Sequence, residues 1–212
     1  MSDSKNHTLF NSVIDSGYTL NDNGTYTKQP KHTYFTLYLG DFDTEDNSID
    51  EIFNTLRTTE GSKEVTIFIH SYGGSIAEGQ RFQNIINNDF KNKSTTYLDN
   101  MGYSMGAMLF TFGHYRVVYE NSEIMFHNYS SGYSGKGHEL KAQQIHKDKT
   151  LTSYVKKTLK PFFKKKELKK LINGKDYWFD SMEMLKRGIA THIESDGKLF
   201  NYEEYLEYRK EK

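Results

Sequence analysis

The chain has 212 residues, which is enough to bury the core of one domain. Its 28 Lys and Arg residues balance 28 Asp and Glu residues, so no global field favours nucleic acid or an anionic membrane surface. The absence of cysteine excludes disulfides, thiol catalysis and thiolate metal sites. No apolar run reaches membrane-spanning length, and the polar start MSDSKNHT does not resemble a signal peptide. The sequence therefore predicts a cytoplasmic protein that binds neither nucleic acid nor membrane.

The first 32 residues form a polar N-terminal extension with one clear local pattern. The β-forming residues Tyr18 to Leu20 and Thr25 to Thr27 flank a turn-forming stretch from Asn21 to Gly24. Asn, Asp and Gly tolerate the positive φ angles of tight hairpin turns. We therefore expect a β-hairpin in this extension.

From Tyr34 onward, segments typical of strands alternate with segments typical of helices. Ser48 with Glu51, and Ser75 with Glu78, form capping boxes that open helices. A third, apolar helix is expected from Ser104 to about residue 112. The expected strands cover residues 34–39, 65–69, 97–98, 115–119 and 124–126. This alternation predicts an α/β fold of repeated βαβ units around a largely parallel sheet.

The second half of the chain is predicted to be mainly helical. Gly132, Gly135 and Gly137 mark a loop or an irregular strand, and a long helix is expected from about Glu139 to Leu159. A lysine-rich segment then leads to a stop at residues 173–174. A short helix should start near residue 180 or 181 and end at Gly188. With residues 194–212 as a charged C-terminal tail, we expect one domain over residues 33–193 and two appendages.

The stretch Gly102-Tyr103-Ser104-Met105-Gly106 fits G-x-S-x-G, a pattern that exposes a serine on a sharp strand-to-helix turn. The same spacing also occurs where chains merely pack closely. A nucleophilic serine needs a base, a group that orients the base, and N–H donors for the oxyanion. His127 is the candidate base. Several downstream carboxylates could orient it, and the residues alone do not choose among them: Asp148, Glu167, Asp176, Asp180 and Glu183.

Four motifs in the chain resemble, in order, those of the Clp protease proteolytic subunit. They are I-x-S-x-G-G-S at Ile69 to Ser75, G-x-S-M-G-A at Gly102 to Ala107, I-M-F-H at Ile124 to His127, and K-D-Y-W-F at Lys175 to Phe179. An E-x-x-x-x-G helix follows the last motif. The resemblance covers residues 34–193 and implies a Clp-protease/crotonase-like fold with a protruding handle helix.

The resemblance also implies a serine endopeptidase and assigns its residues. Ser104 would be the nucleophile, His127 the general base and then acid, and Asp176 the carboxylate that fixes the histidine tautomer. The backbone N–H groups of Gly74 and Met105 would form the oxyanion hole. Gly74 lies at a predicted strand-to-helix junction, where backbone donors are unpaired, and Met105 follows the nucleophile. The chain order Ser, His, Asp differs from those of α/β-hydrolases, chymotrypsin-like and subtilisin-like enzymes.

In the family that the chain resembles, the handle, here about residues 132–160, interleaves two rings. The resemblance therefore implies a homo-oligomer of heptameric rings, stacked as a tetradecamer, with active sites inside a chamber. Gly132, Gly135 and Gly137 would belong to the strand that lines the substrate channel. The substrates would be unfolded or threaded polypeptides, supplied by an ATP-driven unfoldase of the AAA+ class. The hydrolysis itself needs no metal and no cofactor.

Three positions depart from the family pattern, and two other functions stay open. Tyr72 and Tyr129 stand where the family usually has proline, and His70 stands where asparagine is common. These changes affect loops beside the site and leave each catalytic group in place. One alternative is a catalytically inactive ring or scaffold member. The other is a crotonase-fold acyl-CoA enzyme, which would leave Ser104, His127 and Asp176 without a joint purpose.

Overall fold

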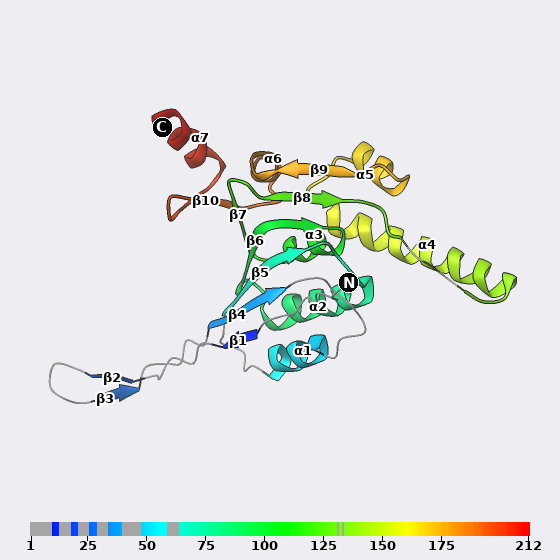
Figure 1. The fold of residues 1–212 in the computed structure, drawn as a ribbon, viewed down its shortest axis with the longest axis horizontal. Coiled ribbons are helices and arrows are strands. Elements are labelled where there is room, and N and C mark those ends of the chain that lie inside the picture. The colour runs from blue at the N-terminus through cyan, green and yellow to red at the C-terminus, as the bar shows by residue number, and fades with distance from the viewer. Residues whose placement is uncertain are drawn as a thin grey trace, which may run out of the picture.

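The structure is a computed structural model that describes residues 10–12, 18–20, 26–28, 34–39, 48–58, 64–130, 132 and 134–212. Its centre is a mixed sheet covered by helices (Figure 1). The strands of this sheet are β1 (Phe10–Ser12), β4 (Tyr34–Leu39), β5 (Glu64–Ser71), β6 (Ser94–Tyr103), β7 (Tyr115–Tyr119), β8 (Glu123–Phe126), β9 (Tyr177–Asp180), β10 (His192–Ser195) and β11 (Lys198–Phe200). The helices are α1 (Ser48–Thr58), α2 (Ile76–Asp89), α3 (Met105–Phe110), α4 (Gly137–Leu159), α5 (Lys165–Ile172), α6 (Ser181–Lys186) and α7 (Tyr202–Glu211).

Strands β4, β5, β6 and β7 are parallel neighbours and form the core of the sheet. Helices α1, α2 and α3 connect them in turn, so each connection is a βαβ unit (Figure 1). The predicted α/β fold with a largely parallel sheet is therefore confirmed. The predicted hairpin is also present, because β2 (Tyr18–Leu20) pairs antiparallel with β3 (Tyr26–Lys28), while its turn lies outside the described residues.

Strand β5 is apolar on the face that the helices cover. In β5 the side chains of Val65, Ile67 and Ile69 are buried, and the intervening residues are more exposed. Helix α2 presents Phe82 and Ile85 to the same core. Each such fully buried side chain stabilises the fold by roughly 1.5–3 kcal/mol. The alternating pattern fixes which face of the sheet carries the helices.

Strand β6 has two different neighbours along one edge. Its residues 95–98 pair with β7, whereas residues 101–103 pair with β8. Between the two stretches, Asn100 adopts a φ of 77°. The hydroxyl of the buried Ser122, in the β7–β8 turn, donates to the carbonyl of Leu98 over 2.9 Å and attaches the turn to β6. The sheet therefore forks at β6 into one branch of β7, β10 and β11 and another of β8 and β9.

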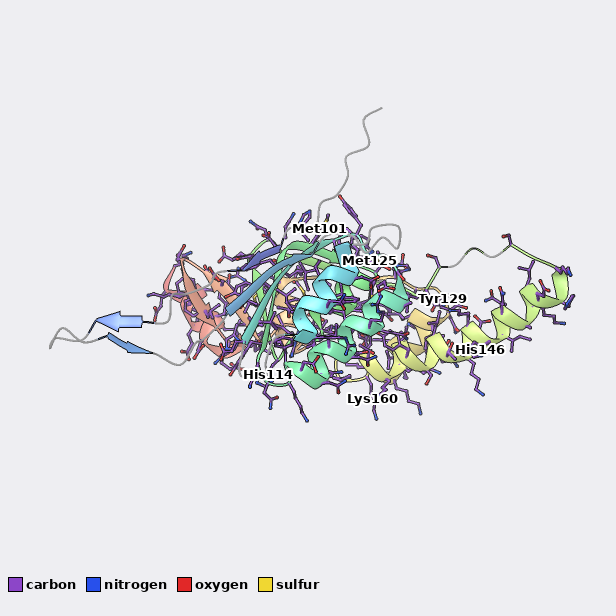
Figure 2. All side chains as sticks on the ribbon, turned by 90° about the horizontal axis from the view of Figure 1, so that it is seen from below. Met101, His114, Met125, Tyr129, His146 and Lys160 are labelled. Atoms are coloured by element: carbon purple, nitrogen blue, oxygen red, sulfur yellow. The ribbon has the colours of Figure 1, made fainter. Side chains whose placement is uncertain are left out.

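Helix α4 projects from the body of the molecule, as the sequence predicted for a handle (Figure 1). No residue from Gly137 to Thr150 is buried, whereas Leu151, Val155 and Leu159 are buried on one face. Figure 2 shows His146 on the projecting part and Lys160 where the helix meets the body. Only the last third of α4 is therefore held by the core of this chain.

The glycine-rich segment before α4 was predicted to be a loop or an irregular strand, and its described residues lie mostly in irregular backbone. Gly132 and Gly135 lie in irregular backbone, and Gly137 is the first residue of α4. The described residues of this segment pair with no neighbouring strand of the chain, and Gly135 has a φ of 155°. An extended segment without a partner strand has no ladder of hydrogen bonds to hold it as a strand.

The C-terminal residues are more ordered than the predicted charged tail. Strand β10 crosses the expected boundary at residue 193 and pairs in parallel with β7, and β11 folds back on it. The side chain of Tyr205, in α7, is only 4% exposed and packs in the core. Residues 194–212 thus extend the domain and are not an appendage.

Arg187 connects the helices that flank β9. Its guanidinium donates two hydrogen bonds of 3.1 Å to the Glu167 carboxylate on α5 and one of 2.6 Å to Glu183 on α6. It also lies 4.5 Å from the centre of the Phe179 ring in β9. The hydrogen bonds from Arg187 hold the pKa of the Glu167 carboxyl below its ordinary value. The network therefore fixes β9 between α5 and α6.

Replacing Arg187 by lysine should lower the free energy of unfolding by about 1–2 kcal/mol at pH 7, because lysine cannot form the two-pronged contact. Because the pKa of Glu167 is lowered by folding, this stabilisation is present above about pH 4.3 and is lost as the pH falls through the folded-state value. Urea unfolding at fixed protein concentration should show a smaller difference in the free energy of unfolding between the unchanged protein and Arg187→Lys near pH 3.5 than at pH 7. Lys186→Ala is the exposed control. An equal gap at both pH values would contradict this role.

Candidate active site

Ser104 sits on a strained turn between β6 and α3. Its φ of 55° and ψ of −120° are rarely adopted by residues other than glycine. Such strain costs on the order of 1–3 kcal/mol and persists only where the surroundings impose it. Here the N–H of Ser104 donates to the carbonyl of Met125 over 2.9 Å, and its carbonyl accepts from the N–H of Met108 over 3.3 Å. Neighbouring segments therefore hold this serine in the conformation expected of an exposed nucleophile.

The two glycines of the G-x-S-x-G pattern are required by close packing. A Cβ atom on Gly102 would lie 2.8 Å from Cδ1 of Leu98, and one on Gly106 would lie 2.9 Å from both Cβ and the carbonyl oxygen of Ser71. Either contact would push β6 or α3 away from its neighbours. The pattern is therefore explained by packing, and that packing is what shapes the serine turn.

The loop after β5 lies directly against Ser104. Gly73 and Gly74 have φ angles of 122° and 138°, and a Cβ on Gly73 would be 2.7 Å from Cβ of Ser104. The N–H of Gly73 is already bonded to Oγ of Ser71 over 3.0 Å, so it is committed elsewhere. Gly74 follows at once, and Met105 supplies the first N–H of α3, which has no acceptor within the helix. The two predicted oxyanion donors thus belong to segments that meet at the serine.

Strand pairing brings His127 and Asp176 to the same end of the sheet as Ser104. In the parallel pair β6–β8, Tyr103 lies opposite Met125. In the antiparallel pair β8–β9, Phe126 lies opposite Tyr177, so the next step along the ladder places His127 opposite Asp176. The three predicted catalytic residues therefore follow or precede three neighbouring strands at one edge.

Ser104 and His127 also line one cavity, which is closed by α2, α3 and α4. Asp176 is exposed and does not belong to its lining. The other residues of the lining are Ile76, Met105, Met108, Phe126, Asn128, Tyr129, Leu151, Tyr154 and Val155. Sequence reasoning missed the contribution of α4 to this cavity, because helical spacing alone does not say which surface a helix covers.

No hydrogen bond joins the side chains of Ser104, His127 and Asp176 in the described part of the chain. The backbone brings them together, but the side chains are not coupled in this state. Catalytic hydrogen bonds are often long in proteins without substrate and tighten only in the complex. The arrangement thus brings the three predicted residues to neighbouring strand ends without a side-chain hydrogen bond among them.

The structure also separates Asp176 from the other candidate carboxylates. Asp148 accepts hydrogen bonds from Tyr129 and Gln144, and Asp180 accepts one of 2.8 Å from the N–H of Glu183 as the N-cap of α6. Glu167 and Glu183 both bind Arg187, as described above. Among these five carboxylates, all within the described residues, Asp176 alone has no hydrogen bond or ion pair. It is therefore the acid that remains available to His127.

Neither a metal site nor a membrane span is found in the part of the chain that the structure describes. No three His, Asp or Glu side chains there are grouped to hold a metal ion, and no helix there is long and apolar enough to cross a bilayer.

The fold and site together define a class. A mixed sheet of βαβ units, with a strained serine beside a histidine and an aspartate at neighbouring strand ends, is the α/β architecture of the Clp-protease/crotonase type. The chain belongs to the Clp protease family, because the model of that family, described as Clp protease, matches residues 38–196. The family predicted from the four sequence motifs is thereby confirmed.

Curated relatives agree at low identity. The chain is 27% identical over 169 residues to an ATP-dependent Clp protease proteolytic subunit of Streptococcus mutans, covering 73% of this chain and 82% of the relative. It is 28% identical over 143 residues to ATP-dependent Clp protease proteolytic subunit 3 of Streptomyces avermitilis, covering 65% of this chain and 64% of that protein. A subunit 1 from Leifsonia xyli is 25% identical over 149 residues, which cover 68% of this chain and 74% of the relative.

Replacing Gly73 by alanine should destabilise the protein by about 1–3 kcal/mol, because the position requires a positive φ and the new Cβ would collide with Ser104. Urea unfolding measures the loss. The matched control is Gly137→Ala, whose added methyl group meets nothing within 4 Å. Equal stability of the two variants would mean that the loop does not lie against the serine as described.

Proposed function

We propose that this chain is a serine endopeptidase of the Clp proteolytic-subunit type. The observation that carries the proposal is the strand register, which sets Ser104, His127 and Asp176 at the ends of three neighbouring strands. The strained conformation of Ser104 supports it, because strain at a non-glycine residue is typical of functional sites. Membership of the family raises the expectation of peptide hydrolysis.

The proposed mechanism assigns one task to each group. Oγ of Ser104 attacks the carbonyl carbon of the scissile bond while His127 takes its proton, and the N–H groups of Gly74 and Met105 stabilise the oxyanion. His127 then gives the proton to the leaving amine, which leaves an acyl-enzyme on Ser104. Water, deprotonated by His127, hydrolyses this ester. Asp176 orients the imidazole and stabilises its charged form.

We further propose that the protein acts as a ring-forming homo-oligomer. The projecting part of α4 buries no residue of its own chain, and its Ile145 side chain is 62% exposed. A long helix that leaves the body in this way suits contact with other copies. The glycines at 132, 135 and 137 would then line the substrate path, and a partner unfoldase of the AAA+ class would supply unfolded polypeptides. The names of the relatives describe those proteins as ATP-dependent.

A catalytically inactive ring or scaffold member is the second candidate. The observation that favours it is the lack of hydrogen bonds among the three catalytic side chains in the described structure. Such a protein would keep the fold and the assembly but not the chemistry. An acyl-CoA enzyme of the crotonase type is less consistent with the site, because it gives His127 and Asp176 no task.

Replacing Ser104 by alanine should lower the hydrolysis of short fluorogenic peptides on the order of 10⁴-fold or more, because the nucleophile is lost. Purified proteins should be compared by turnover, by oligomeric state in solution and by thermal unfolding. Ser130→Ala, at an exposed serine, is the matched control. Turnover retained in Ser104→Ala would remove the nucleophile from this mechanism, and absence of turnover in the unchanged protein would favour the scaffold alternative.

Replacing Asp176 by asparagine should lower kcat on the order of 10⁴-fold with little loss of stability, because its carboxylate has no structural partner. Asp180→Asn is the comparison, since Asp180 caps α6. Asparagine is also a good N-cap, so that variant should keep both its activity and its stability. Peptide turnover and thermal unfolding of both variants decide the matter. A loss of activity confined to Asp180→Asn would show that the wrong carboxylate has been assigned.

A further inference from the structure

The segment that follows β8 and contains His127 is anchored by side chains. Residues 127–130 belong to no helix or strand, so the ladder of hydrogen bonds that orders β8 ends before His127. Asn128 is attached to α5, because its Nδ2 donates to the carbonyl of Ile172 over 2.9 Å. Tyr129 is attached to the other neighbouring helix, α4 (Figure 2). The two residues after the proposed base thus each have an anchor on a different helix.

The attachment to α4 is a closed set of three hydrogen bonds. The Tyr129 hydroxyl donates to the Asp148 carboxylate and accepts from Nε2 of Gln144 over 3.0 Å. The same Nε2 donates to Oδ1 of Asp148 over 2.9 Å. Gln144 and Asp148 are four residues apart and therefore lie on one face of α4. These three residues, the Tyr129 cluster, support one another, and bonds to a carboxylate are stronger than bonds between neutral groups.

Tyr129 also belongs to the wall of the site. Its side chain lines the same cavity as Ser104 and His127, together with Leu151 of α4. Tyr129 is half-buried, whereas Gln144 and Asp148 are exposed. The ring and the hydroxyl thus hold one residue at two points, two positions beyond the base. A displacement of Tyr129 would be passed along this short backbone link to His127.

We propose that Tyr129, Gln144 and Asp148 are positioning residues for His127, and that they fix the segment after the base so that its imidazole can reach Ser104. They do not touch the reacting atoms and act only through the histidine. The inference rests on the proposed peptidase function and adds to it a second means of orienting the base besides Asp176.

A purely structural role for the Tyr129 cluster would have a different signature. The body of the protein already holds α4 through Leu151, Val155 and Leu159, which are buried. Because Gln144 and Asp148 are exposed, loss of their contacts should cost little stability. If the cluster positions the base, its loss should instead slow the chemistry at nearly constant stability. The rate of reaction at Ser104 and thermal unfolding therefore separate the two roles.

Removal of the Tyr129 hydroxyl tests the proposal in two backgrounds. In Tyr129→Phe, the rate of fluorophosphonate labelling of Ser104 and kcat for a short peptide should fall about tenfold with KM nearly unchanged, because a misplaced base slows only the chemistry. In a protein that already carries His127→Ala, the same substitution should cause no further loss of labelling rate, since no imidazole is left to position. Equal losses in the two backgrounds would overturn the proposal.

Two exposed glutamines of α4 provide a matched pair. Gln144→Ala removes a member of the cluster and should also slow the labelling of Ser104, whereas Gln143→Ala, at the neighbouring residue, should not. Tyr115→Phe, at a half-exposed tyrosine, controls for the loss of a phenol hydroxyl. All variants are compared at the same oligomeric state in solution. Equal labelling rates in the two glutamine variants would contradict the role of the cluster.

Hydrogen exchange separates this inference from the proposed function, because it does not depend on catalysis. The backbone amides of residues 127–130 should exchange faster in Tyr129→Phe than in the unchanged protein, as measured by mass spectrometry of peptides that cover the segment. That result would support the cluster as the restraint on His127 even if the unchanged protein neither reacts with the probe nor hydrolyses peptides. Unchanged exchange in Tyr129→Phe would overturn the inference and leave the peptidase function standing.

Discussion

The fork of the sheet at β6 is the constraint on which the rest of the site depends. A single strand pairs first with β7 and then with β8, and the buried Ser122 hydroxyl makes this change of partner possible. It accepts from the N–H of Tyr119 at the end of β7 and donates to Leu98 of β6, both over 2.9 Å. The turn between β7 and β8 is thereby fixed to the middle of β6. As a result β8 and its partner β9 reach the sheet only beside the last residues of β6, next to Ser104.

This arrangement explains how a strained serine is kept in place. The strain at Ser104 is offset by hydrogen bonds to β8 and within α3. Gly73, Gly102 and Gly106 lack a Cβ, so the loop after β5, strand β6 and helix α3 approach their neighbours without collision. The same β8 backbone that holds Ser104 leads directly into His127. Any shift of β8 relative to β6 would therefore change the conformation of Ser104 and the position of His127 together. The geometry of the site therefore depends directly on the pairing of β8 with β6.

The sequence predicted what depends on local pattern. The hairpin at residues 18–28, the parallel βαβ core, the serine turn and the start of α6 at its Asp180 cap are all short-range features, and all are present. Features that depend on distant partners were missed. Strands β10 and β11 are only four and three residues long and exist through pairing with β7 and with each other. Likewise, residue types could not single out Asp176, because two of the competing carboxylates have partners far along the chain: Asp148 binds Tyr129, 19 residues away, and Glu167 binds Arg187, 20 residues away. The N-cap role of Asp180 is local and was open to sequence reasoning.

The central claim is that strand register converts Ser104 into an activated nucleophile. The most direct measurement is reaction of the purified, folded protein with a fluorophosphonate probe, with the adduct located by peptide mass spectrometry and His127→Ala treated in parallel. The account predicts one adduct, on Ser104, and a large loss of labelling rate in His127→Ala, because without the base the hydroxyl keeps its proton. No adduct on the assembled protein, or equal labelling of the two proteins, would contradict it.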